Sequence, residues 1–407
     1  MVPSQTKTTV LLGIAQTLAW ASSYYLPAIL AVSISKDVGT TPSMVFAAFS
    51  VALLVAAAVG PYAGRLIDHH GGRSVLMVSN LVFASGLLAL SQAQQSTHVF
   101  AAWAMLGIAM GSGLYEASFA TAVRLHEQKA RVTITGITLF AGFASTVGWP
   151  LSTYLESTLG WRTTCMIWAL LHLLIGLPLN ALLPRARMAS LGPKAPTTAR
   201  SPSATLSPSQ VRRATFLMAF VFAATWFIST AMAAHLPELL ASAGVATAAA
   251  VGIAALVGPS QVAGRMIEFT FLKNSHPLLS ARLAALAHPL GVLCLGVFGS
   301  SAALAFAILH GLGNGILTIA IGTLPLLVFG AEGYGQRQGL LMVPARIVQA
   351  GAPFLFGLAA AEWGARSLWF SALLGLAACA ALWIMTLDMK SASFGAANSD
   401  SSKLNDL

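Results

Sequence analysis

The feature that most constrains this chain is a series of long, uninterrupted apolar runs that alternate with short polar turns. A helix needs about 20 largely apolar residues to cross the hydrocarbon core of a bilayer. The runs are continuous and do not alternate over about 10 residues, which excludes a transmembrane β-barrel. We therefore predict an all-α polytopic membrane protein with twelve transmembrane helices, near residues 9–34, 43–64, 74–93, 98–121, 133–155, 162–183, 214–237, 246–268, 278–298, 301–328, 339–361 and 367–387.

Composition supports this class and argues against an enzyme. Only 8% of the 407 residues are charged and 57% are hydrophobic, whereas about 25% of a soluble domain is charged. His126-Glu127 begins a zinc-protease pattern, but its fifth position is Ala130 and not histidine. Neither a G-x-S-x-G nucleophile nor a phosphate-binding loop occurs. The cysteines form no disulfide or metal pattern, so we expect no enzymatic activity, no cofactor and no metal.

The basic excess is explained by membrane topology. The chain has 22 Lys and Arg against 12 Asp and Glu, a net charge of +10, and basic residues hold loops on the cytoplasmic side. No basic stripe interleaves with aromatic residues, so a nucleic-acid partner is not expected. One stretch rich in Pro, Ser, Thr and Ala contains no acid and predicts a flexible cytoplasmic linker; its basic residues are Arg185, Arg187, Lys194, Arg200, Arg212 and Arg213.

The linker divides the chain into two halves. We expect an N-terminal six-helix bundle over residues 1–183, the linker over 184–213, a C-terminal six-helix bundle over 214–388 and a flexible cytoplasmic tail over 389–407. An even number of helices on each side of the linker places both termini in the cytoplasm. The N-terminus shows no clear cleavage site, so the first helix is expected to be retained.

The halves repeat one another. Three short patterns of the first half return in the second half, in the same order and each on the corresponding helix: residues 26–30 as 236–240, 63–68 as 263–268, and 111–114 as 313–316. One such match can arise by chance, but three in order indicate a duplicated unit. A duplicated six-helix unit is one way to build a transporter, with its solute site between the halves near the bilayer midplane.

A charged, glycine-punctuated turn follows the second apolar run, at residues 64–73. Gly64 permits close helix approach, Gly71 permits turn dihedrals, and Asp68 can accept hydrogen bonds from neighbouring helix-end amides. With Arg73, these residues resemble the signature G-x-x-x-D-[RK]-x-G-[RK]-[RK] of the major facilitator superfamily. His69 and Gly72 depart from it.

The resemblance to this superfamily covers about residues 9–387 and implies a secondary transporter that works by alternating access. It also implies that the turn acts as a gate, together with its second-half copy. In that copy Arg265 and Glu268 are the expected gate residues. We expect Asp68 to bind a neighbouring helix end.

Glu116 and Arg346 are ionisable residues within apolar runs, where such groups are candidates for function. Counted from the predicted helix ends, both lie roughly 8–11 Å inside the cytoplasmic boundary, and the family fold brings their helices together. They can form a gating pair, or Arg346 can anchor an anionic solute while Glu116 carries a proton. Alternatively the pair is structural, or Glu116 bonds Arg124 or Arg131.

Other polar and aromatic residues lie on helices that line the cavity in this family. His235 and His310 are candidate proton sites because histidine titrates near neutral pH, whereas His172 and His288 are interpreted as structural. Further candidates for contact with the solute are Asn314, Gln349, Tyr115, Trp20, Tyr24 and Trp226.

Two substrate classes remain open from the sequence. One is a small organic anion, such as a carboxylate, moved with a proton; the other is an amphipathic drug or metabolite that is exported. A membrane-embedded enzyme is the alternative of a different class. The expected partners are the solute, H+ and the lipid bilayer. We expect a functional monomer in a cytoplasmic membrane, the inner membrane of a bacterium.

Overall fold

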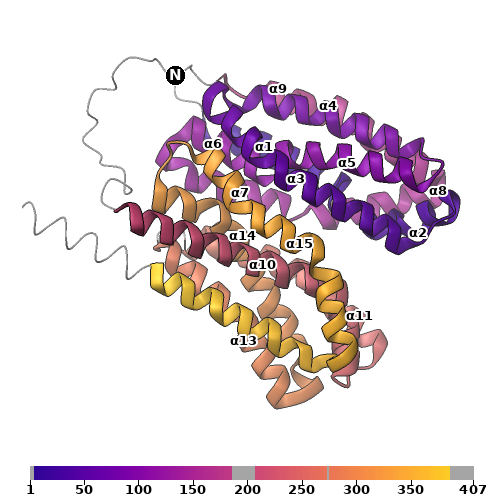
Figure 1. Cartoon of the computed structure of the whole chain (residues 1–407), viewed down its shortest axis with the longest axis vertical. Coiled ribbons are helices and arrows are strands. Elements are labelled where there is room, and N and C mark those ends of the chain that lie inside the picture. The colour runs from indigo at the N-terminus through magenta and orange to yellow at the C-terminus, as the bar shows by residue number, and fades with distance from the viewer. Residues whose placement is uncertain (1–3, 186–206, 273–274, 386–407) are drawn as a thin grey trace, which may run out of the picture.

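The computed structural model describes residues 4–185, 207–272 and 275–385, and all regular structure within them is helical (Figure 1). The predicted linker lies largely outside the described residues, and the predicted tail over 389–407 lies outside them entirely. The prediction of an all-α fold is confirmed.

The N-terminal half contains nine α-helices and two short turns of other helix type. The α-helices are α1 (Gln5–Ser22), α2 (Pro27–Val38), α3 (Pro42–His70), α4 (Gly72–Ser91), α5 (Ser96–Gly113), α6 (Tyr115–His126), α7 (Ala130–Ala141), α8 (Ala144–Leu171) and α9 (Leu177–Ala181). A 3-10 turn, η1 (Glu127–Lys129), precedes α7, and a π-helical turn, η2 (His172–Gly176), precedes α9.

The described part of the C-terminal half is built in the same way. Its helices are α10 (Pro208–Ser242), α11 (Thr247–Ala255), α12 (Val257–Ile267), α13 (Pro277–Phe298), α14 (Ala303–Phe329), α15 (Tyr334–Trp363) and a final helix over residues 368–385. Shorter turns are η4 (Glu268–Leu272), η5 (Gly299–Ala302) and η6 (Gly364–Ser367).

Nine segments of the described chain are long and apolar enough to cross a membrane. Three of them have 52 or 53 residues, which is about 80 Å of straight helix against a hydrocarbon core of about 30 Å. Each of the three contains one glycine with positive φ, at Gly160 (80°), Gly299 (61°) or Gly364 (53°). Dividing them at these glycines yields twelve crossing segments, the number that the sequence predicts.

Two prolines at equivalent positions of the repeat have different effects. Pro27 starts α2 after a break at residues 23–26, because proline is favoured in the first turn of a helix. Pro237 instead lies inside α10, which continues to Ser242. The prediction that this helix ends at residue 237 is therefore wrong; neighbouring helices support a proline-interrupted transmembrane helix.

The linker prediction also needs a correction at its C-terminal end. Residues 208–213, predicted as linker, form the first turns of α10. Ser207 and Gln210 form a reciprocal capping box at this start, and Pro208 occupies a position where proline is favoured. These capping interactions extend the helix past the end of the apolar run.

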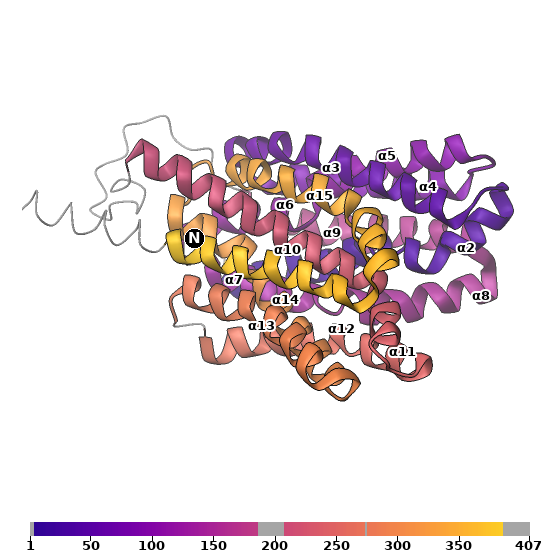
Figure 2. The same cartoon turned by 60° about the horizontal axis from the view of Figure 1, so that its bottom comes forward.

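The two halves contact each other from one end of the bundle, which we call the turn end because it carries residues 64–73, as far as Ser50 of α3, whose hydroxyl donates to the carbonyl of Ala350 of α15 at 3.1 Å. The starts of α1 and α10 lie at this end, at the left of Figures 1 and 2. Helix α15 lies along α3, and α14 packs on α7 (Figure 2). Away from the turn end, α2 packs mainly on α3 and α8, and α11 mainly on α10, α12 and α14, all within their own halves.

Candidate functional site

Asp68 joins the two halves at the turn end. Its Oδ1 accepts a hydrogen bond from the amide of Gly335, and its Oδ2 accepts one from Gln336, each at 2.8 Å. These are the first amides of α15, which have no partner inside the helix and carry partial positive charge. This is the docking on a helix end expected from the sequence.

Glycines make this contact possible. A Cβ atom at Gly64 would overlap the backbone of Gly335, and a Cβ atom at Gly335 would overlap Gly64. Gly71 has a φ of 85°, in the left-handed region that glycine adopts without strain. Arg73 makes no ion pair within the described residues.

A second connection between the halves lies in the repeated turn. Arg131 of α7 donates to Oε1 of Glu268 at 3.2 Å and to the carbonyl oxygens of Ser275 and Leu272. Glu268 is 4% exposed, and its Oε2 has no hydrogen-bond partner among the residues that the structure describes. Arg265, one turn earlier, does not share in this ion pair: its guanidinium lies against Gly142 of the N-terminal half.

Glu116 and Arg346 form an ion pair between the halves. Nη2 of Arg346 donates to Oε1 of Glu116 at 2.9 Å, and Nη1 donates to Oε1 of Gln349 at 3.0 Å. Gln349 in turn donates to the hydroxyl of Tyr24 at 3.1 Å. Arg346 also lies 5.3 Å from the ring centre of Trp226. Because Arg346 is only 3% exposed, this series of hydrogen bonds links the two halves inside the protein.

The pair lies farther from the turn ends of its helices than the sequence predicts. Helix α15 begins at Tyr334 and not at 339, and the α6 helix ends at His126 and not at 121. Arg346 is therefore twelve residues, and Glu116 ten residues, from the turn end of its helix. At 1.5 Å per residue these distances are about 18 and 15 Å; the depth of 8–11 Å below the cytoplasmic boundary stays a prediction. The helices extend because Asp68 caps one and the other continues beyond its apolar run.

Aromatic rings surround this pair. Trp20 and Trp226 come from different halves, with parallel rings and centroids 6.1 Å apart. Two tyrosine rings pack on Trp20: the ring centroid of Tyr115 lies 4.7 Å from that of Trp20, and the ring centroid of Tyr24 lies 5.1 Å from it. The indole nitrogens of both tryptophans are buried and have no hydrogen-bond partner in the described part of the chain. Buried donors of this kind are costly unless a further group binds them, so the cluster is suited to a ligand that carries acceptors.

The predicted histidines lie away from the Glu116–Arg346 pair. His235 bonds the carbonyl of Pro353 at 2.8 Å. His310 bonds His288, Nδ1 to Nδ1, at 3.1 Å, and Nε2 of His288 bonds Ser371 at 2.9 Å. These side chains lie within the C-terminal half and not at the boundary between the halves.

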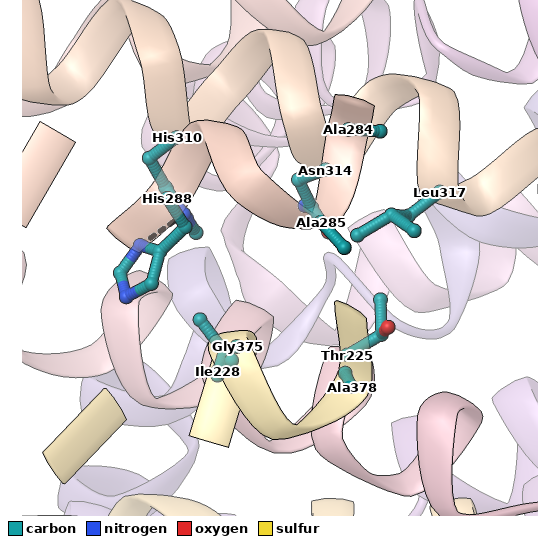
Figure 3. Close-up of a pocket in the computed structure, with 10 residues that line it drawn as sticks. All are labelled: Thr225, Ile228, Ala284, Ala285, His288, His310, Asn314, Leu317, Gly375 and Ala378. Atoms are coloured by element: carbon teal, nitrogen blue, oxygen red, sulfur yellow. Dashed lines mark hydrogen bonds between the residues drawn. The ribbon is translucent and has the colours of Figure 1, made fainter. Parts of the chain in front are cut away.

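His288 and His310 line a small cavity, together with Asn314 (Figure 3). The cavity offers about 20 Å³ to the centre of a water molecule, which is enough for one or two waters and too little for an organic solute. Asn314 itself donates to Ser229 at 2.9 Å. In this geometry neither His310 nor Asn314 is brought to the residues that surround Arg346.

Sequence reasoning missed two of these connections. The sequence offers Arg131 only as a partner for Glu116, whereas the structure places it at the start of α7, facing the repeated turn that holds Glu268. His288 was interpreted as structural by itself, and its pairing with His310 depends on packing between two helices that no sequence spacing reveals. For the pairing of the two histidines, the available signal in the sequence is that each is a polar residue within an apolar run.

Known proteins share the fold of this chain. The sequence profile described as Major Facilitator Superfamily matches residues 12–324. Among curated proteins, no sequence matches the chain.

Several solved structures have a similar fold. The transporter FucP in its outward conformation has a TM-score of 0.74 and 14% identity, covering 93% of this chain and 98% of that one. The proton:xylose symporter XylE, bound to 6-bromo-6-deoxy-D-glucose, has a TM-score of 0.70 and 14% identity, covering 93% and 95%. The human organic anion transporter MFSD10 has a TM-score of 0.67 and 15% identity, covering 93% and 100%. At these identities the likeness extends to the fold alone.

Proposed function

The chain belongs to the major facilitator superfamily, and on this premise we propose that it moves a small organic anion across a membrane together with a proton. It is a secondary transporter, and the finer assignment rests on the Glu116–Arg346 ion pair between the halves at 2.9 Å. Ionisable groups at this depth are costly and are candidates for function. The turn end is assigned to the cytoplasm, where the basic residues of the linker place it.

Alternating access follows from the contacts between the halves. The Asp68 contact and the Arg131–Glu268 pair close the turn end, while α2 and α11 at the other end pack mainly within their own halves. We assign this geometry to the outward-facing state. Reaching the inward-facing state requires both turn-end contacts to break, which makes them the gate.

Glu116 is the proposed proton carrier. Among the acidic residues that the structure describes, it is the one that follows Tyr115 of the aromatic cluster, in the first turn of α6 and about 15 Å from the turn end of that helix. Protonation of Glu116 removes its negative charge and leaves Arg346 without an ionic partner. Because an uncompensated buried charge is strongly unfavourable, a solute anion bound nearby supplies negative charge that offsets the protonation of Glu116, so the proton and the solute are expected to bind together. Arg346 is occupied by Glu116 and Gln349 in this state, so its role is to link the gate to the proton.

Proteoliposomes test this function. Uptake of a panel of labelled solutes is measured with and without an inward-directed proton gradient. Carboxylates should accumulate only with the gradient, and Glu116→Gln should exchange carboxylates without accumulating them. If no solute of the panel is taken up with or without the gradient, or if the protein hydrolyses the solutes, the transporter assignment is refuted.

Export of an amphipathic solute is the second candidate, favoured by the aromatic cluster of Trp20, Tyr24, Tyr115 and Trp226. Arg346→Lys separates the two. An anion transporter that depends on the planar fork of arginine for coupling should lose accumulation, whereas an exporter of neutral or cationic amphiphiles should keep its substrate affinity and change mainly in rate.

A further inference from the structure

Arg265 is a buried arginine between the halves that pairs with none of the acidic residues the structure describes. Its side chain is 5% exposed, its Nε has no hydrogen-bond partner, and it makes no ion pair within the described residues. Its Nη1 occupies the place that a Cβ atom on residue 142 of the N-terminal half would take. The side chain therefore reaches from α12 across the boundary to the other half.

The charges near this boundary leave Arg265 uncompensated. Arg346 is paired with Glu116, and Arg131 is paired with Glu268. Glu268 lies three residues after Arg265, yet its bonded oxygen faces Arg131. An arginine deep in a membrane protein is strongly unfavourable without a counter-charge. One negative charge is thus missing from this region, and a bound anion can supply it.

Other free donors belong to the aromatic cluster at the same boundary. Gly142, which Arg265 contacts, lies two residues after Phe140, whose carbonyl accepts a hydrogen bond from Thr17 at 3.0 Å, one turn before Trp20. The rings of Tyr25 and Tyr115 both lie against Trp20, and neither hydroxyl has a hydrogen-bond partner within the described residues. Tyr115 packs on Trp20, whose buried indole nitrogen also lacks a partner. The region therefore offers hydrogen-bond donors and flat aromatic rings. Such a lining suits a flat solute that carries several hydrogen-bond acceptors.

We propose that Arg265 binds the carboxylate of a flat organic anion, with the hydroxyls of Tyr25 and Tyr115 donating to its oxygen atoms and Trp20 covering its face. This inference rests on the proposed transport of an organic anion and names the site that holds it. The guanidinium suits the task because its planar fork matches both carboxylate oxygens. Arg265 is then the solute anchor and not a gate residue, whereas Arg346 responds to the proton on Glu116.

Direct binding to the purified, detergent-solubilised protein tests the site without requiring transport. The probes are benzoate and its neutral analogue benzamide, and the readouts are tryptophan fluorescence and thermal unfolding. Benzoate should quench fluorescence and raise the unfolding temperature of the wild type, and benzamide should do neither. Arg265→Lys keeps the charge but loses the fork, so it should weaken benzoate binding at least tenfold.

Gly142→Ala provides a second variant that leaves the arginine in place. Gly142 has φ −59° and ψ −26°, which alanine adopts freely, so the new Cβ should only displace the end of Arg265. It should weaken benzoate binding as Arg265→Lys does. The matched control is Gly351→Ala, whose Cβ would meet only ordinary contacts with Leu355, and its affinity for benzoate should equal that of the wild type.

The outcomes separate this site from the proposed function. If benzoate binds the wild type and both Arg265→Lys and Gly142→Ala with equal affinity, Arg265 is not the anchor, although the organic-anion function stands. If benzoate and benzamide act alike on the wild type, or neither acts, the anion site is refuted. Failure of carboxylate uptake in proteoliposomes refutes the proposed function itself.

Discussion

Replacing Asp68 by asparagine should open the turn end. In the wild type, both carboxylate oxygens accept hydrogen bonds from the first amides of α15, each at 2.8 Å. Asparagine keeps one acceptor and places an NH2 group opposite the second amide. The change removes a hydrogen bond to a charged group, worth about 1.5–3 kcal/mol, and a favourable charge at a helix N-terminus, worth about 0.3–1 kcal/mol.

These terms together disfavour the closed turn end by about 2–4 kcal/mol. Since about 1.4 kcal/mol corresponds to a factor of ten in an equilibrium, the ratio of closed to open protein should fall about 30- to 700-fold. The fold should survive, because the carboxylate contacts backbone amides only at the boundary between the halves. Transport should slow severely, because the protein accumulates in the state with an open turn end and returns to the outward-facing state slowly.

Spin labels report the change directly. Cysteines at Lys7 of α1 and Leu279 of α13, both exposed, place one label on each half at the turn end. Asp68→Asn should add a long-distance population that the wild type lacks. The control is Glu332→Gln, which removes an exposed carboxylate at the same end and should leave the distance unchanged. An unchanged distance in Asp68→Asn, with normal transport, would refute the gate assignment.

The remaining predictions address the interface, the ion pair and pH. Gly64→Ala should open the turn end in the same label assay, because its Cβ would overlap backbone of the other half, whereas Gly60→Ala meets only an ordinary contact at 3.9 Å and should not. Arg346→Ala leaves Glu116 buried without its partner, which should cost about 3–5 kcal/mol; thermal unfolding should show recovery when Glu116→Gln is added, and no recovery would contradict the pairing energy. Burial and nearby arginines lower the pKa of His276 below its ordinary value of 6.5, so the folded state binds fewer protons and stability should fall as pH drops below about 6.5. His276→Asn should lose less stability over that range in denaturation at pH 7.5 and 5.5, and an identical loss would refute this cause.

Much of the fold was predictable from the sequence because the bilayer permits few structures. Continuous apolar runs must form helices that satisfy their own backbone groups, and the repeat located the two halves. The contact of Asp68 with a helix end was also accessible, since a carboxylate in a glycine-rich turn has few favourable partners.

Helix ends were predicted less well. The start of α15 at Tyr334 depends on capping by Asp68 from the other half, which no local pattern contains. The start of α10 at Pro208 depends on a capping box in a stretch whose composition favoured a linker.

Side-chain direction was the least predictable feature of the site. His310 lies on a helix assigned to the cavity, yet it faces His288 inside the C-terminal half. Arg265 belongs to a gate-like pattern, yet its guanidinium lies apart from Glu268 and beside Gly142. Which face of a helix meets which neighbour is set by packing of the whole bundle, and the sequence alone does not determine it.

The most direct measurement of the central claim is proton flux driven by a solute. Proteoliposomes that contain the protein and an internal pH indicator receive benzoate outside, with no imposed proton gradient. Ionophores and protein-free vesicles account for passive permeation of benzoic acid. The account predicts protein-dependent internal acidification that Glu116→Gln abolishes, while that variant still exchanges labelled benzoate. The central claim would be contradicted if Glu116→Gln takes up benzoate with the same proton flux as the wild type. It would also be contradicted if the wild type shows no protein-dependent flux of benzoate or protons.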